Sequence, residues 1–188
     1  MKKVLGAYPT MITPYKEDGS VDYETVKKYV HWYHDNGCEG IFAVCQSSEI
    51  FYLTPEEIVK INRTVYETAQ EIWKNGGRKM EIVSSGIMAN FHPALYSWMY
   101  EHQEDSRSER LSAYLGVTSL VEHKCYPIPA KRYLKEYVGL PIGDACRSME
   151  DRTVPTLSSE LHDIYEMTRI AHEMIEVPLK EYPELKNM

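Results

Sequence analysis

Apolar residues in the amino-terminal half of the chain alternate between short runs and longer stretches with helical spacing. The runs at 7–14, 40–45 and 81–85 are the candidates for strands, and the continuous one at 40–45 is typical of a parallel strand covered on both faces. Between them, 22–36 and 54–75 repeat apolar residues every three or four positions, as one face of a helix does. This order of strand, helix, strand, helix and strand predicts βαβ units with a parallel sheet.

Local signals mark the ends of both predicted helices. Asp22 is suited to cap the first helix, and Asn36-Gly37 is suited to end it, because glycine adopts the left-handed backbone conformation easily. Thr54-Pro-Glu-Glu57 combines a capping residue, a proline in the first turn and a glutamate three positions after the cap, which is a capping box. Asn75-Gly-Gly77 ends the second helix.

The pattern changes after Gly86. The remaining residues contain almost no strand signal, and helical spacing returns in four stretches: 93–101, a helix beginning near Leu111, 129–138, and a long last helix capped by Ser158 or Ser159. A complete β/α barrel has eight strands and about 250 residues. We therefore predict an α/β chain with a partial (β/α) TIM-type barrel over 1–103, a C-terminal all-helical region over 104–177 and a frayed tail over 178–188.

Composition narrows the function classes. The 188 residues carry 28 acidic and 21 basic side chains, so the net charge of -7 disfavours binding to nucleic acid or to an anionic membrane surface. No apolar run approaches the roughly 18 residues that span a bilayer, and no signal-peptide core follows Met1. We expect a cytoplasmic protein.

The cysteines and histidines do not form a recognisable metal motif. The four cysteines are far apart and contain no CxxC, which favours buried free thiols over a disulfide or a metal site. His31 and His34 lack a completing ligand set, and His172-Glu173 lacks the second histidine of HExxH. We therefore expect neither a metal nor a cofactor.

Several segments together resemble the dihydrodipicolinate synthase/N-acetylneuraminate lyase family. Gly6–Pro14 and Asn36–Phe42 look like the start of that family, and Cys45-Gln-Ser-Ser-Glu49 falls where the family has its Gly-Thr-Thr-Gly-Glu loop. Downstream, Ser84–Asn90 resembles the family's strand-eight segment, and Tyr126–Lys131 resembles its Asn-Pro-x-x-x-Lys run. The resemblance therefore implies the first strands of a barrel joined near 81–86 to its strand-eight segment.

The family consists of class I aldolases that act on pyruvate or other 2-oxo acids through a lysine Schiff base, with a tyrosine as proton relay. By resemblance, Ser47 keeps the hydroxyl that serves this relay, and the predicted substrate-binding residues are Gln46, Ser47 and Ser85. Glu49 is placed at the pocket mouth or at a cap, where structural hydrogen bonding is favoured over acid/base work. Asn90 matches an asparagine of the family.

The central part of the family's barrel has no counterpart here. Neither its Tyr-Asn-x-Pro-x-Arg motif nor the Gly-x-Lys-Asp/Glu motif of its sixth strand is present between the segments that resemble strands three and eight. Tyr126-Pro-Ile-Pro129 is interpreted as the start of a helix rather than as the catalytic tyrosine motif. Lys79 is expected to be solvated at a strand start, and Lys131 and Lys135 are expected on a helix surface.

Two functions follow from this pattern. The first is a lyase of the pyruvate-aldolase type that lacks its Schiff-base lysine and is inactive unless a partner chain completes it. The alternative is a non-catalytic remnant that only folds or self-associates. In both, we expect homo-oligomers through the helical tail and the open sheet edges, with a small 2-oxo acid as the possible ligand.

Overall fold

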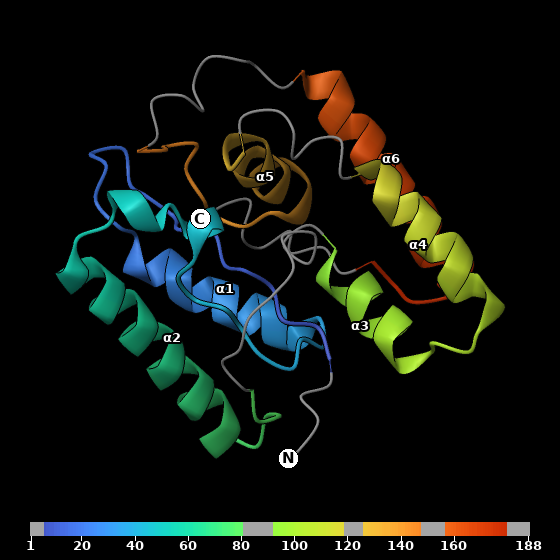
Figure 1. Ribbon diagram of the computed structural model, residues 1–188, viewed down its shortest axis with the longest axis horizontal. Helices are drawn as coiled ribbons and strands as arrows, with labels where there is room; N and C mark the ends of the chain where they lie inside the picture. Colours follow the sequence, from blue (N-terminus) through green and yellow to red (C-terminus); the bar gives the residue numbers. More distant parts are fainter. Residues whose placement is uncertain (1–5, 81–91, 119–125, 148–156, 180–188) are drawn as a thin grey trace. The chain divides into compact units, whose positions relative to one another are not determined.

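A computed structural model describes residues 6–80, 92–118, 126–147 and 157–179 (Figure 1). The chain divides into two compact units. The first contains Met1–Thr13 and Asp22–Glu101, and the second contains Pro14–Val21 and His102–Met188. Within the described ranges, helices are the main elements of both units.

The first unit is built on two packed helices, α1 (Tyr23–Asp35) and α2 (Pro55–Lys74), which lie side by side (Figure 1). Asp22 caps α1 as predicted, because its carboxylate accepts hydrogen bonds from the backbone N–H groups of Glu24 and Thr25, both at 3.2 Å. The predicted capping box of α2 is also present: Thr54 accepts from the N–H of Glu57 at 3.2 Å, and Glu57 accepts from the N–H of Thr54 at 2.9 Å.

The facing sides of α1 and α2 are apolar and buried, as their spacing predicts. The buried residues of these faces are Val26, Tyr29, Val30, Trp32 and Tyr33 on α1, and Ile61, Val65, Ala69 and Ile72 on α2. Tyr29 and Tyr33 stack with ring centroids 5.8 Å apart, so aromatic packing forms much of this core. The short helix α3 (Pro93–Glu101) belongs to the same unit.

The first two predicted strands lie beside each other, but in the described residues they form a single parallel bridge, Thr10–Phe42, rather than a regular ladder. The N–H of Met11 donates to the carbonyl of Phe42 at 2.9 Å, and the N–H of Phe42 donates to the carbonyl of Pro9 at 2.9 Å. The predicted parallel pairing is therefore present locally. The third predicted strand, 81–85, lies outside the described residues.

The second unit contains α4 (Ser106–Thr118), α5 (Ile128–Tyr133), the π-helical turn η5 (Leu134–Val138) and α6 (Ser158–Ile175). The helices α4 and α6 pack against each other (Figure 1). The prediction that Ser158 or Ser159 caps α6 is wrong, since the N-cap is Leu157 and Ser158 begins the helix. The carboxylate of Glu160 accepts from the N–H of Leu157 at 2.9 Å, so the third residue of the helix satisfies the backbone donor of the cap residue.

The predicted surface position of Lys131 is also wrong, because its side chain is fully buried. Its ammonium donates to the carbonyl of Ala145 at 2.6 Å and lies 4.6 Å from the ring centroid of Tyr15. Ala145 and Tyr15 both lie outside this helix in the sequence. The spacing of apolar residues along the helix therefore does not reveal that they contact Lys131. Lys135 is half-exposed and pairs with Asp144 at 3.4 Å, in agreement with its predicted surface position.

Candidate functional site

The loop with the predicted site residues follows the apolar run 40–45 and forms two short 3-10 turns, η1 (Gln46–Ser48) and η2 (Ile50–Tyr52). Ser48 holds this loop together. Its hydroxyl accepts a hydrogen bond from the N–H of Cys45 at 3.0 Å and donates to the carbonyl of Met11 at 2.5 Å. The carbonyl of Ala43, at 3.3 Å, is a second and more distant acceptor for the same hydroxyl. Since Ser48 and Met11 are fully buried, this hydroxyl satisfies a backbone carbonyl that water cannot reach.

Two threonines of the first segment also contact the loop. The hydroxyl of Thr13 donates to the carbonyl of Ser48 at 2.7 Å. The hydroxyl of Thr10 lies 3.5 Å from that of Ser47, at the outer limit of a hydrogen bond. All of these groups are buried, so Ser47 and Thr10 form a pair of hydroxyls inside the first unit.

The other predicted residues of the loop differ in exposure. Gln46 is exposed, whereas Glu49 is buried. Glu49 adopts a left-handed backbone conformation, with φ of 59° and ψ of 39°, and its N–H donates to the carbonyl of Gln46 at 3.0 Å. This conformation is uncommon for a residue with a Cβ, and such residues are concentrated at functional sites.

Ser85 and Asn90, which were predicted on the strand-eight side of the pocket, lie outside the described residues. The described half of the site therefore consists of the loop 45–49 and the segment 10–13. Thr10, Thr13 and Ser48 were not predicted to matter. The signal that could have found the two threonines is their polar side chain within an otherwise apolar, proline-bounded run.

The arrangement supplies neutral hydroxyl donors and one buried carboxylate, Glu49. Hydroxyls of this kind can bind a carboxylate group or pass a proton along a hydrogen-bonded chain. Within 6–80, 92–118, 126–147 and 157–179, no group of three histidine, cysteine or acidic side chains could hold a metal ion.

The thiol of Cys38, in the first unit, is buried. Burial raises the pKa of Cys38 to about 12, although the hydrogen bond with Ser97 and the charge of Arg78 act in the opposite direction. The thiol is therefore protonated at neutral pH, and only the thiolate is reactive.

The guanidinium of Arg78 donates to Glu39 at 2.7 Å and to the carbonyl of Cys38 at 2.6 Å, which fixes the segment after α2 against the end of α1.

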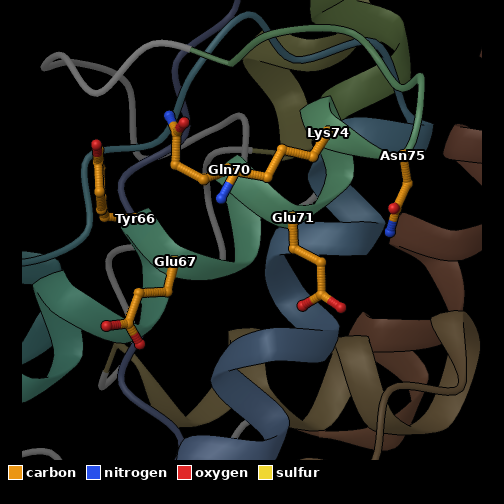
Figure 2. Close-up of a pocket in the computed structure, with 6 residues that line it drawn as sticks. All are labelled: Tyr66, Glu67, Gln70, Glu71, Lys74 and Asn75. Atoms are coloured by element: carbon orange, nitrogen blue, oxygen red, sulfur yellow. The ribbon is translucent and has the colours of Figure 1, made fainter.

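Surface hollows on α2 offer no converging chemistry. One, of about 380 Å³, is lined by side chains from a single helix and its cap, which point in different directions in Figure 2. The lining residues are Tyr66, Glu67, Gln70, Glu71, Lys74 and Asn75. We therefore take the loop 45–49 as the candidate site.

None of the helices in the described ranges is both long and apolar enough to cross a membrane.

Comparison with known proteins agrees with the resemblance seen in the sequence. Residues 3–74, which include the loop 45–49, match the model of the Dihydrodipicolinate synthetase family. The 4-hydroxy-tetrahydrodipicolinate synthase of Chlorobaculum parvum is 27% identical over 177 residues, which cover 90% of this chain and 52% of that protein. The enzyme of the same name from Methanococcus vannielii is 30% identical over 106 residues, which cover 56% of this chain and 33% of that protein.

Solved structures show the same fold. A crystal structure of a dihydrodipicolinate synthase matches with a TM-score of 0.61 at 13% identity, covering 92% of this chain and 99% of that one. The dihydrodipicolinate synthase from Aquifex aeolicus matches with a TM-score of 0.55 at 15% identity, covering 94% of this chain and all of that one.

The chain spans about half or less of the length of these two sequence relatives. Residues 3–74 are the part of the chain that matches the model of the dihydrodipicolinate synthetase family.

Proposed function

We propose that the loop 45–49 binds a small 2-oxo acid such as pyruvate, and that the hydroxyl of Ser47 is its main donor. The observation that carries this proposal is the buried pair of hydroxyls, Thr10 and Ser47, 3.5 Å apart within the segment that matches the family model. A hydroxyl held in a buried loop can donate to a carboxylate without first giving up strong bonds to water.

The remaining site residues have supporting roles in this proposal. Gln46 and Ser85 complete the contacts to the substrate, and Ser47 also serves as the hydroxyl of a proton relay. Glu49 and Asn90 are structural residues near the mouth of the pocket. The left-handed backbone of Glu49 supports its assignment as a fixed corner of the loop, because the surrounding structure must hold such a conformation in place.

We further propose that the chain does not form a Schiff base by itself. None of its lysines stands in a segment that matches the family's Gly-x-Lys-Asp/Glu motif, which carries the Schiff-base lysine. The ammonium of the fully buried Lys131 donates to the carbonyl of Ala145. The chain would then be a cytoplasmic 2-oxo-acid-binding protein with a partial barrel over 1–103 and a helical region over 104–177.

The experiment combines binding with chemical trapping. Saturation-transfer NMR with pyruvate should show binding with a Kd on the order of 1 mM, weakened about tenfold or more by Ser47→Ala. Ser159→Ala, which removes an exposed hydroxyl far along the sequence, is the matched control and should leave binding unchanged.

Trapping with pyruvate and borohydride should leave the mass of the chain unchanged. A lysine adduct would refute the proposed absence of Schiff-base chemistry. Pyruvate binding that is absent, or insensitive to Ser47→Ala, would refute the site and favour the non-catalytic remnant.

A further inference from the structure

Thr10 brings a second buried hydroxyl to the candidate loop from a different segment of the chain. Its hydroxyl lies 3.5 Å from that of Ser47, and only 6% and 7% of the surfaces of the two residues are exposed. Because 3.5 Å is the outer limit of a hydrogen bond, the contact between the two hydroxyls is weak. At this spacing, one ligand oxygen can lie about 2.7–2.8 Å from both of them and accept two stronger bonds.

The backbone on both sides of Thr10 is held by the parallel bridge to Phe42. The N–H of Met11 donates to the carbonyl of Phe42, and the N–H of Phe42 donates to the carbonyl of Pro9, both at 2.9 Å. Threonine is also branched at Cβ, which restricts the rotation of its side chain. The backbone and the side chain of Thr10 therefore have little freedom to lose when a ligand binds.

The residue after Ser47 is fixed to the same segment. The hydroxyl of Ser48 donates to the carbonyl of Met11 at 2.5 Å, and the hydroxyl of Thr13 donates to the carbonyl of Ser48 at 2.7 Å. The first of these contacts joins the next residue of each segment, so it sets the spacing between the two hydroxyls. Donors that the surrounding structure already holds in place lose less entropy on binding than mobile ones do.

A carboxylate is the ligand group that fits this pair of hydroxyls best. The hydroxyl hydrogens of serine and threonine rotate, so both can turn toward one acceptor. Hydrogen bonds to an ionised acceptor are about twice as strong as those between neutral groups, so a carboxylate gains more from two donors than a ketone does. Since Thr10 and Ser47 are both buried, the group that reaches them belongs to a small molecule.

We propose that Thr10 is a second substrate-binding residue, and that its hydroxyl and that of Ser47 together hold the carboxylate of a small 2-oxo acid. This inference rests on the proposed function of the loop 45–49 and extends the site to the first segment of the chain. The keto group of the ligand is then left to other residues of the site.

Thr10→Val tests the assignment, because valine keeps the shape of threonine and removes its hydroxyl. In saturation-transfer NMR of the full chain, this variant should bind pyruvate about tenfold or more weakly than the wild-type chain. Thr10→Ser keeps the hydroxyl and should bind within about threefold of the wild-type chain. Thr68→Val is the matched control and should leave binding unchanged, since Thr68 is as buried and its hydroxyl donates to the carbonyl of Thr64 within α2 at 2.8 Å.

Lactate tests which group of the ligand the pair holds, because it keeps the carboxylate of pyruvate and lacks the ketone. Lactate should bind to the wild-type chain, and Thr10→Val should weaken its binding by the same factor as that of pyruvate. A loss confined to pyruvate, or a wild-type chain that does not bind lactate, would show that the pair contacts the ketone and would overturn the assignment.

The wild-type chain provides a readout that does not depend on the folding of any variant. Pyruvate should shift the NMR signal of the Thr10 methyl group and leave that of Thr68 unchanged. Pyruvate binding that Ser47→Ala weakens and Thr10→Val does not would overturn this inference and leave the proposed function in place. Absence of pyruvate binding to the wild-type chain would overturn both.

Discussion

The hydroxyl of Ser48 donates a hydrogen bond to the carbonyl of Met11 at 2.5 Å, and this contact joins the candidate loop to the first segment of the chain. The same hydroxyl accepts from the N–H of Cys45. Because Ser48 has two backbone partners, we expect it to affect stability more than Ser47 does. The hydroxyl of Ser47 lies 3.5 Å from that of Thr10, at the limit of hydrogen bonding.

We therefore predict that Ser48→Ala lowers the free energy of unfolding by about 1–3 kcal/mol, because it removes the hydroxyl partner of the buried carbonyl of Met11 and of the partly buried N–H of Cys45. Ser47→Ala, the matched change one residue earlier, should cost less than about 1 kcal/mol while weakening the binding of pyruvate. Urea unfolding of both variants measures this difference. Equal losses of stability would show that the loop does not depend on Ser48 in this way.

Parts of the fold that depend on neighbouring residues could be predicted from the sequence. Asp22 and Thr54 cap α1 and α2 as predicted, because a cap needs only its own side chain and the next few N–H groups. The parallel pairing of the first two segments also followed from their apolar runs, although the described residues form only one bridge there.

The parts that depend on distant residues were not predicted. Ser48 was noted only as a replacement for a loop glycine, and its partner Met11 lies 37 positions away. Lys131 was placed on a helix surface, but its ammonium donates to the carbonyl of Ala145 and lies against the ring of Tyr15. Periodicity describes one element at a time, so it does not show which other segment covers a face.

Arg78 should contribute to the stability of the first unit through its hydrogen bonds to Glu39 and to the carbonyl of Cys38. We predict that Arg78→Ala costs about 1–2 kcal/mol, a value at the lower end for charged hydrogen bonds because the side chain is partly exposed. Arg78→Lys should recover less than half, since an ammonium lacks the planar fork that reaches two acceptors. Urea unfolding measures both, with the exposed Arg110→Ala as control. Full recovery with lysine would show that charge alone matters.

His172 should make stability depend on pH. Burial lowers the pKa of its imidazole below the ordinary value of 6.5, and the hydrogen bond with the carbonyl of Val177 at 3.0 Å offsets this only in part. Because the folded state has the lower pKa, the unfolded state takes up the proton first as the pH falls. The free energy of unfolding should therefore decrease as the pH falls from about 7.5 through 6.5, and level off below the folded-state pKa.

His172→Gln should make this decrease smaller, as measured by urea unfolding at several pH values. The exposed His162→Gln on the same helix is the matched control. A wild-type chain and a His172→Gln variant with parallel stability curves across this pH range would show that His172 does not contribute.

Lys131 and Lys135 differ by one turn of helical backbone and should differ strongly in reactivity. Lys131 is fully buried, and its ammonium donates to the carbonyl of Ala145, whereas about half of the Lys135 side chain is exposed. An acylating reagent reaches a buried amine only after local opening of the structure. We predict that Lys131 reacts at least tenfold more slowly than Lys135 in a short pulse read by peptide mass spectrometry. In urea, where the unfolded chain exposes both lysines, the two rates should become similar. This comparison controls for the intrinsic reactivity of the two amines. Equal rates in the folded chain would mean that the amine of Lys131 is open to solutes, and a carbonyl compound could then reach it as well.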